Sequence, residues 1–274
     1  MKGKNFILNS ILLLFVVILV GCGNGDATGS ENDGEDNAGN DNEEKETLVV
    51  ASTPTGPPYT FMNNETDEME GIMIDIVDII GEELDKEIQI ESTSFSSLIP
   101  SLQGGKVDLI SAGMVITEER KEVINFSDEV FGFGEGLIVH EDNNDISTFE
   151  DLEGKTVGTQ QGTIYYDLIE ENGNTENNSV YESIGDMLQD LSNGRLDAVV
   201  ADEPVLIYLE ENNPNFAVRI IEDYESQIID GVGLGVSKDD EELLEEVNGV
   251  IADLKADGSL EEIYSKWNVS WSFE

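Results

Sequence analysis

The stretch Leu98–Ala112, LIPSLQGGKVDLISA, decides how this chain folds. Leu98 and Leu102 recur at helical spacing, the paired glycines that follow end the helix, and Val107–Ala112 predicts a buried strand. Residues 188–200, LQDLSNGRLDAVV, repeat the pattern: a helical face is followed by Gly, a base, an apolar residue, Asp and a strand. Two similar helix–strand units in one chain predict two similar lobes.

Strands and helices also alternate outside these two units. Short apolar runs predict the strands, and residues at helical spacing predict the helices. The strands are expected at 48–51, 88–90 and 155–158, and the helices at 71–84, 163–171 and 243–254. This alternation predicts an α/β fold with mostly parallel sheets covered on both faces.

The charge of the chain limits its partners. The 274 residues include 60 acidic and 13 basic ones, for a net charge of −47. Residues 48–274 alone hold 51 acids and 10 bases, so the acidity belongs to the folded part. Such a surface repels nucleic-acid phosphates and anionic lipid headgroups, so we expect no nucleic-acid partner. We interpret the charge as solvation suited to a salty or alkaline external medium.

The first 22 residues have the features of an export signal. Lys2 and Lys4 precede the unbroken apolar run Ile11–Val20, which is too short for the roughly 20 residues of a membrane-spanning helix. The end of this segment, Leu19 to Cys22, resembles the lipobox of bacterial lipoproteins. We therefore expect a signal peptide at 1–21 and lipidation, such as palmitate, at Cys22. The alternative is an ordinary signal peptide with a chance cysteine.

Residues 22–47 are rich in Gly, Asn, Asp and Glu, and we expect a flexible acidic tether that follows the lipid. The chain has one Cys and one His. These counts exclude an intramolecular disulfide, a Cys-based metal site and a His-rich zinc site. We expect neither a metal nor another cofactor.

Seven segments, in order along the chain, resemble the family 3 solute-binding proteins of ABC importers. The first, GIMIDI, is similar to the GFDVDL helix start of that family. The ordered set covers essentially all of residues 48–268. The seven segments are Gly71–Ile76, Phe95–Asp108, Ala112–Arg120, Asn125–Asp128, Asp151–Thr163, Asn193–Asp202 and Lys255–Trp267.

The resemblance implies a two-lobed, periplasmic-binding-protein-like clamp that closes on an amino acid. Lobe one would comprise 48–138 plus 232–274, and lobe two 139–231, with two hinge strands near Leu137–Val139 and Gly233–Val236. It also implies an ABC transporter permease as partner. We expect a monomer on the extracellular face of the cell membrane, on the periplasmic side in a Gram-negative host, held by its lipid anchor alone.

Arg120 and Asp202 are the principal binding candidates. Thr117 is a good N-cap, which places Arg120 in the first turn of a helix, where a cation opposes the helix dipole unless an anion binds beside it. In the family, the position of Arg120 holds the ligand carboxylate and that of Asp202 the ligand ammonium. The alternatives are a surface arginine and an ordinary N-cap before Pro204.

The resemblance implies further ligand contacts from side chains and backbone. Phe95 would pack against the ligand, or would belong to the core. Backbone groups of the loop that begins at Ala112 would reach the ligand, and a helix starting near Thr163 would offer N–H groups, unless Thr163 is a plain N-cap. The remaining candidates are Tyr59, Gly113, Met114, Gln161 and Gly162.

Two positions depart from the family pattern. Gly56 stands where an aromatic is usual, so either a wall of the pocket is missing or Tyr59 fills it. Val115 replaces the usual Thr or Ser and removes a hydroxyl. Both changes leave the family resemblance intact and leave the ligand open.

Two other functions remain as alternatives. Some relatives on this scaffold are cyclohexadienyl or arogenate dehydratases, and Glu203 is the extra carboxylate that could serve such an enzyme as acid or base. The chain could also be the binding component for a separate sensor. We expect a binding protein and not an enzyme.

The lipidation of Cys22 is directly testable. We expect Cys22→Ser to release the protein from the membrane into the medium, because the thiol that carries the lipid is gone. Fractionation of cells that express each form would measure this. A variant that stays with the membrane would show that the lipobox interpretation is wrong.

Overall fold

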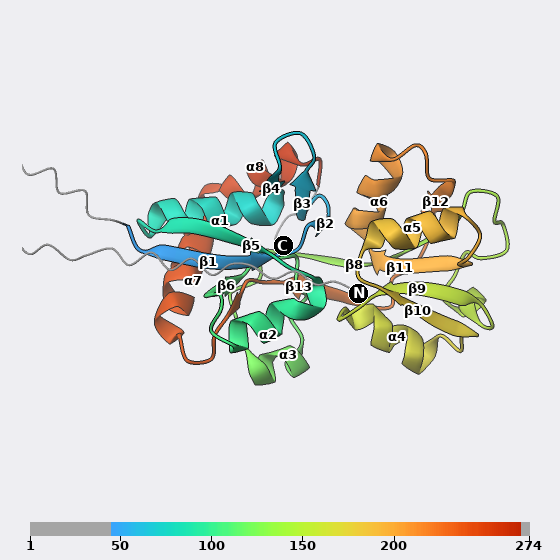
Figure 1. The fold of residues 1–274 in the computed structure, drawn as a ribbon, viewed down its shortest axis with the longest axis horizontal. Coiled ribbons are helices and arrows are strands. Elements are labelled where there is room, and N and C mark those ends of the chain that lie inside the picture. Colours follow the sequence, from blue (N-terminus) through green and yellow to red (C-terminus); the bar gives the residue numbers. More distant parts are fainter. Residues whose placement is uncertain (1–44, 270–274) are drawn as a thin grey trace, which may run out of the picture. The chain divides into compact units, whose positions relative to one another are not determined.

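The computed structural model describes residues 45–269, which belong to one compact unit spanning residues 44–274. The predicted signal peptide at 1–21, the lipidation of Cys22 and most of the predicted tether at 22–47 lie outside the described residues. Two sheets form the framework, each with helices on both faces (Figure 1). The fold is α/β and two-lobed, with one sheet in each lobe.

The first sheet has the strand order β5-β1-β6-β14-β7. Its strands are β1 (Thr47–Ser52), β5 (Glu87–Ser92), β6 (Leu109–Ile110), β7 (Asn125–Phe126) and β14 (Gly235–Val236). A small antiparallel sheet of β2 (Thr55–Gly56), β3 (Thr60–Asn63) and β4 (Glu68–Glu70) stands beside it.

The second sheet has the order β10-β9-β11-β8-β12, and β13 pairs with β8. Its strands are β8 (Phe131–His140), β9 (Thr156–Gln160), β10 (Asn177–Tyr181), β11 (Ala198–Asp202), β12 (Val218–Ile220) and β13 (Ile229–Val232).

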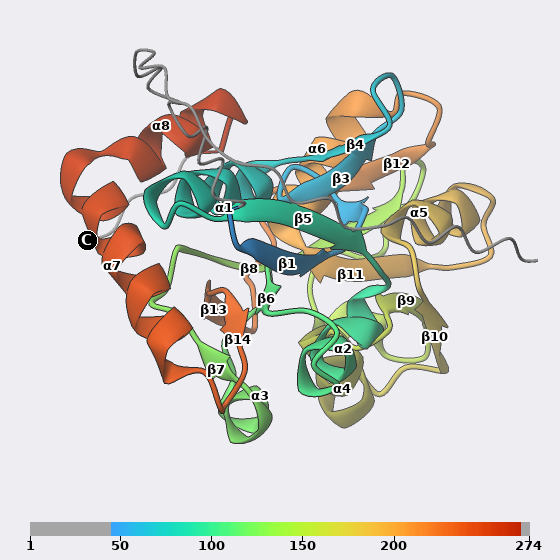
Figure 2. The same cartoon turned by 60° about the vertical axis from the view of Figure 1, so that its left-hand side comes forward.

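The helices follow the predicted alternation with the strands. They are α1 (Ile72–Glu83), α2 (Leu98–Gln103), α3 (Glu118–Val123), α4 (Ile164–Asn172), α5 (Ile184–Ser192), α6 (Glu203–Asn212), α7 (Glu241–Asp257) and α8 (Ser259–Lys266). Two 3₁₀ turns lie at Phe95–Ser97 and Glu150–Leu152. Figures 1 and 2 show α1 and α2 on opposite faces of the first sheet, and α5 and α4 on opposite faces of the second.

The prediction of mostly parallel sheets was wrong. The pairs β5–β1, β1–β6, β10–β9 and β9–β11 are parallel, whereas β14 and β8 are antiparallel to their neighbours. The cause is the path of the chain. It passes into the second sheet along β8 and returns to the first along β14, so each of these strands enters a sheet from the opposite end. Two strands also differ in extent from their predictions. The strand expected at 107–112 is the shorter β6 (Leu109–Ile110), and the strand expected from 196 is β11, which begins at Ala198.

The predicted internal repeat is confirmed and has a physical cause. The Asp108 carboxylate accepts the Val49 N–H at 2.9 Å, and the Asp108 N–H donates to the Val49 carbonyl at 2.8 Å. Asp197 makes the same two bonds with Thr156, each at 2.8 Å. Gly105 and Gly194 precede them with φ of 63° and 69°, the left-handed conformation that ends a helix on glycine. Each Gly-x-x-Asp motif therefore joins a helix end to a parallel strand of its sheet, β1 in the first and β9 in the second.

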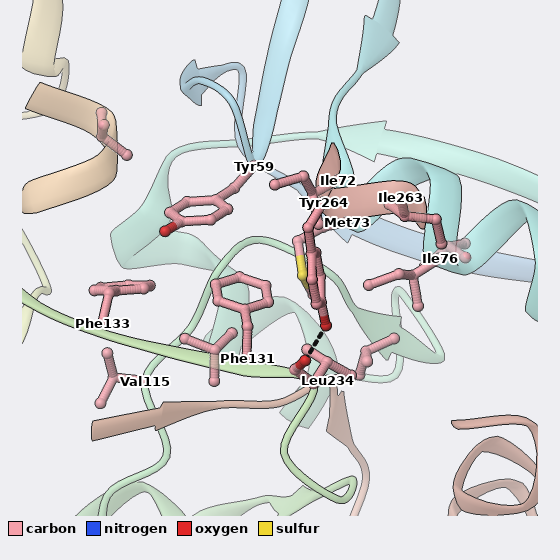
Figure 3. Packing of buried hydrophobic residues seen from close by; sticks show 14 of the residues in the cluster. Tyr59, Ile72, Met73, Ile76, Val115, Phe131, Phe133, Leu234, Ile263 and Tyr264 are labelled. Atoms are coloured by element: carbon pink, nitrogen blue, oxygen red, sulfur yellow. Dashed lines mark hydrogen bonds between the residues drawn. The ribbon is translucent and has the colours of Figure 1, made fainter. Parts of the chain in front are cut away.

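The largest core cluster reaches from α1 to the strand that leaves the first lobe. Figure 3 shows Ile72, Met73 and Ile76 packed near Phe131 and Tyr264, whose hydroxyl donates to the Val130 carbonyl. Burial of such aromatic and aliphatic side chains supplies most of the stability of a fold that has no disulfide. The position of β8 is therefore fixed by the core of lobe one.

Two paired strands connect the lobes. Residues 131–134 of β8 pair with β13, and residues 135–139 pair with β11. The predicted hinge residues Leu137–Val139 lie opposite Ala198–Val200, inside the second sheet. The connecting pair thus lies earlier in β8, and the exact lobe boundaries stay a prediction.

The connecting strands need glycine for close packing. A Cβ at Gly134 would lie 2.3 Å from Ser226 Oγ and 3.0 Å from the Ile228 carbonyl oxygen, whereas a Cβ at Gly249, on an exposed face of α7, would meet nothing within 4 Å. We expect Gly134→Ala to lower the free energy of unfolding by about 1–3 kcal/mol through overpacking. Gly249→Ala should raise it by about 0.5–1 kcal/mol through helix propensity. Urea unfolding of both variants checks this, and equal effects would contradict the packing argument.

Candidate functional site

Arg120 links the two lobes. It lies in α3, which starts as predicted: the Thr117 side chain accepts the Arg120 N–H at 3.1 Å. The side chain is buried, with 9% of its surface exposed. Its Nη1 donates to the Val115 carbonyl at 2.6 Å, and its Nη2 donates to the Gly162 carbonyl at 3.0 Å. Val115 follows β6 of the first sheet and Gly162 follows β9 of the second, so one guanidinium bridges loops of both lobes.

Asp202 approaches the same region from lobe two. It ends β11, and its Oδ1 accepts a hydrogen bond of 2.5 Å from the Tyr165 hydroxyl. It occupies the N-cap position of α6, but its side chain makes no capping bond. The ordinary N-cap alternative therefore does not explain where this carboxylate points.

Burial and charge act on both groups. Burial raises the pKa of Asp202 to about 6, against the opposing effects of the Tyr165 hydrogen bond and the charge of Arg120. Burial lowers the pKa of Arg120, and the negative charge of Asp202 is the main opposing cause. A cation and an anion from different lobes therefore lie close enough to influence each other in a desolvated place.

Phe95 lies beside Arg120. The Arg120 Cζ is 5.7 Å from the centroid of the Phe95 ring, a cation–π distance. The ring is partly buried and also packs against the apolar cluster of Leu98 and Leu102. Both predicted roles of Phe95, a wall beside the ligand and a core contact, are therefore compatible with its place.

Tyr59 and Gly113 lie behind this region. The Tyr59 ring stacks on Phe131 at 4.6 Å and on Phe133 at 5.2 Å, and only 2% of the residue is exposed (Figure 3). Gly113 has φ of 63°, and a Cβ there would lie 3.3 Å from the Tyr59 ring. Burial raises the pKa of Tyr59, followed by the nearby charges of Asp202 and Glu203. Tyr59 is thus a buried core residue close enough to Asp202 and Glu203 for their charges to affect its pKa.

The other predicted contact residues are buried or have backbone groups that are already hydrogen-bonded. Ala112 and Met114 are buried members of the lobe-one core, with 6% and 1% exposed. The Gln161 N–H donates to the Tyr181 carbonyl at 2.8 Å, and the Thr163 N–H and hydroxyl both donate to Gln160, at 3.3 and 2.8 Å. The N–H groups of Gln161 and Thr163 are therefore engaged within lobe two.

The sequence interpretation missed three polar residues near the site. Tyr165 falls within a helix that was correctly predicted, and its contact with Asp202 spans 37 positions. The Gln160 side chain donates to Thr55 Oγ1 at 3.2 Å, between the lobes. Glu135 is fully buried, and its carboxylate accepts bonds from Tyr224, Gln227 and Ile228. Of these three residues, only Glu135 could have been noticed in the sequence. It is the one charged residue in the stretch 131–139, whose other residues are apolar or glycine.

A separate groove of about 670 Å³ lies between Pro58, α6 and residues 266–269. Glu203 lines it, with Tyr208 and Trp267, whereas Arg120 and Phe95 do not. Burial raises the pKa of Glu203, and the charge of Glu135 adds to the shift. Glu203 and its chain neighbour Asp202 therefore face different surroundings.

Residues 45–269 show no group of three or more His, Cys, Asp or Glu side chains placed to hold a metal ion. In the same part of the chain, no helix has the length and apolarity needed to cross a membrane.

Two α/β lobes joined by two strands, with opposite charges facing each other between them, define a solute-binding protein of the clamp type. The chain matches the model of the bacterial extracellular solute-binding proteins, family 3, over residues 48–270. It belongs to that family, and the predicted resemblance is confirmed.

Three relatives illustrate the family. The ABC transporter glutamine-binding protein GlnH of Bacillus subtilis is 30% identical over 96% of this chain and 97% of its own length. The structure of an ancestral arginine-binding protein bound to arginine is 35% identical, with a TM-score of 0.74 over 81% of this chain and 97% of that one. The ancestral amino acid-binding protein AncCDT-1, a precursor of cyclohexadienyl dehydratase, is 31% identical, with a TM-score of 0.74 over 81% and 95%.

The raised pKa of Asp202 makes a prediction about the unliganded protein. The folded state favours the protonated acid, so ionisation should cost stability as pH rises from about 4, near the usual pKa, to about 6, and the cost should then stay constant. A shift of roughly two units corresponds to a cost on the order of 2–3 kcal/mol.

Asp202→Asn removes this titration and keeps an oxygen for Tyr165. We expect the unfolding free energy of the native protein, minus that of Asp202→Asn, to fall between pH 4 and pH 7. Urea unfolding of both proteins at several pH values measures the difference, which cancels the titration of the other acids. A difference that does not depend on pH would show that Asp202 is not shifted.

Proposed function

We propose that this chain is the substrate-binding component of an ABC importer and that it captures an α-amino acid between its two lobes. Arg120 would bind the carboxylate and Asp202 the ammonium. The observation that carries the proposal is the convergence of a buried guanidinium and a half-buried carboxylate from different lobes, each of which affects the pKa of the other.

The chemistry of the two groups supports a zwitterionic ligand. A guanidinium has five N–H donors in a planar fork, and its bonds to Val115 and Gly162 engage two of them. The other donors could hold a carboxylate with charge-assisted hydrogen bonds. An ammonium between that carboxylate and Asp202 would complete a chain of charges across the gap. Because each lobe would hold one end of the ligand, binding would favour closure.

The comparisons support the amino-acid class but leave the particular amino acid open. The proteins described above are named for glutamine and for arginine. Gly56 and Val115 reduce the side chains available to contact a ligand, compared with the family pattern stated from the sequence. We therefore propose an α-amino acid without naming one.

The cellular setting follows from the same proposal. We propose a signal peptide at 1–21, a lipid on Cys22 and a tether at 22–47, which would hold a monomer at the outer face of the membrane. The partner would be the permease of the importer, and the bound amino acid would be its cargo.

An enzymatic role has less support. AncCDT-1 is itself described as an amino acid-binding protein. Glu203, the extra acid expected for a dehydratase, lines the groove beside α6 that Arg120 does not reach. Prephenate is nevertheless a useful member of a ligand panel, because its turnover would favour the enzyme.

A thermal-shift panel on residues 44–274 would test the proposal. The panel comprises the twenty amino acids, cystine, ornithine, citrulline, ectoine, betaine and prephenate, at high and low salt. A ligand at 100 times its dissociation constant adds about 2.7 kcal/mol, so we expect one α-amino acid, or a small group of them, to raise the melting temperature by about 5–10 °C. Silence across all amino acids would overturn the proposed ligand class.

Two arginine variants give a matched comparison. Arg120→Ala should abolish the shift, and Arg195→Ala should retain it, because Arg195 pairs with Asp190 at an exposed position. Both changes remove one positive charge, so a general electrostatic effect would act on them equally. Full binding by Arg120→Ala would contradict the carboxylate contact.

A further inference from the structure

We propose that Tyr165 is a positioning residue of the binding site: its hydroxyl holds one oxygen of Asp202 and so turns the other oxygen toward the ligand's ammonium. This inference rests on the proposed role of Asp202. It adds a residue that contacts the ligand only through another side chain.

The geometry of Tyr165 fits this role. The tyrosine lies in the first turn of α4, directly after the loop whose Gly162 carbonyl meets Arg120. Its ring is buried, with 3% exposed, among core residues of lobe two such as Val157 and Ile169. The ring therefore has little freedom to move. Its hydroxyl reaches Asp202 Oδ1 at 2.5 Å, a short bond for a phenol and a carboxylate.

The groups around the Tyr165 hydroxyl fix it as a donor. Burial is the first cause that raises the pKa of Tyr165, and the charge of Asp202 and the hydrogen bond to it come next, followed by the charge of Glu135. Loss of the phenol proton beside these acids is strongly disfavoured. The hydroxyl therefore keeps its proton and donates it to Asp202.

Asp202 faces charged and titratable groups from several elements. Arg120 of α3 and Tyr165 of α4 stabilise its ionised form. The charge of Asp202 helps to raise the pKa of Tyr59, which lies in the turn before β3. Glu135 is its register partner on β8, and Glu203 is its neighbour at the start of α6. Of these groups, Tyr165 makes the direct hydrogen bond to the carboxylate and thereby sets its orientation.

The arrangement also restricts the ligand. With Oδ1 engaged by Tyr165, Oδ2 is the oxygen that would receive an N–H donor. A primary or secondary ammonium can supply that donor, whereas a quaternary ammonium such as that of betaine cannot. We therefore expect rejection of betaine and recognition of a free amino group.

The chain contains a matched control for the test. The Tyr181 hydroxyl donates to Asp190 Oδ2 at 2.9 Å, in the same lobe, and Arg195 Nη1 donates to Asp190 Oδ1 at 2.6 Å. Tyr181→Phe thus removes the same kind of tyrosine–aspartate bond away from Arg120. A merely structural effect of losing a hydroxyl would appear in both variants.

The first measurement needs no ligand. The unfolding free energy of Tyr165→Phe minus that of Tyr165→Phe/Asp202→Asn is measured from pH 4 to pH 9. The corresponding native pair is the native protein and Asp202→Asn. We expect the midpoint of the pH-dependent difference to move up by about one unit, because the ionised form of Asp202 loses a hydrogen bond. A midpoint equal to that of the native pair would overturn the inference. The same comparison in a Tyr181→Phe background should reproduce the native midpoint.

The second measurement is binding. Calorimetry with L-glutamine and L-arginine, and with any other panel compound that stabilises the native protein, is run at pH 6.0 and 8.0. We expect Tyr165→Phe to bind about 10-fold more weakly at pH 8.0 and weaker still at pH 6.0, with Tyr181→Phe unchanged. Native-like affinity of Tyr165→Phe at both pH values would overturn the inference while leaving the proposed function intact. Absence of amino-acid binding by the native protein would instead overturn the proposed function, and with it the positioning role.

Discussion

A buried guanidinium and a half-buried carboxylate, presented by different lobes, constrain the rest of this structure. Removing two such charges from water is expensive, and the cost is recovered only with well-placed partners. Each lobe supplies part of them: Val115 and Gly162 offer carbonyls to Arg120, and Tyr165 offers a hydroxyl to Asp202. Val115 and Gly162 lie in loops that follow strands, and Tyr165 lies in the helix after β9, so the positions of the two sheets decide whether the charges are accommodated.

The same residue types behave differently where water reaches them. Asp190 also accepts bonds from a tyrosine and an arginine, and these bonds lower the pKa of its carboxyl group. At Asp202 burial is stronger than the tyrosine and the arginine together, and the pKa rises. The two carboxyl groups therefore have the same kinds of hydrogen-bonding or charged neighbour but shift in opposite directions, because desolvation is the largest cause at Asp202 and not at Asp190.

The repeated Gly-base-apolar-Asp motif explains why so much of the fold could be predicted from the sequence. Asp108 and Asp197 bond to β1 and β9, strands that come earlier in the chain, and glycine supplies the helix end. The motif could be recognised without knowledge of these contacts, because it occurs twice in the sequence. The direction of β8 and β14 could not be read in this way, because it depends on how the chain passes between the sheets. The same limit applies to the site. Arg120 stood out by its position at a helix start, whereas no repeat or local pattern marks Tyr165, whose role shows only in its contact with Asp202.

Closure of the lobes has contributions that do not depend on a ligand. Arg120 bonds to Gly162, Gln160 bonds to Thr55, and Phe61 meets Tyr208 at 6.0 Å between ring centroids. Each of these contacts joins the two lobes. A ligand therefore needs to add only the difference between the closed and open states, and not the whole free energy of bringing the lobes together. In the proposed site, a ligand carboxylate would meet a guanidinium that already bonds to Gly162 of lobe two, which would reduce the entropy lost on binding.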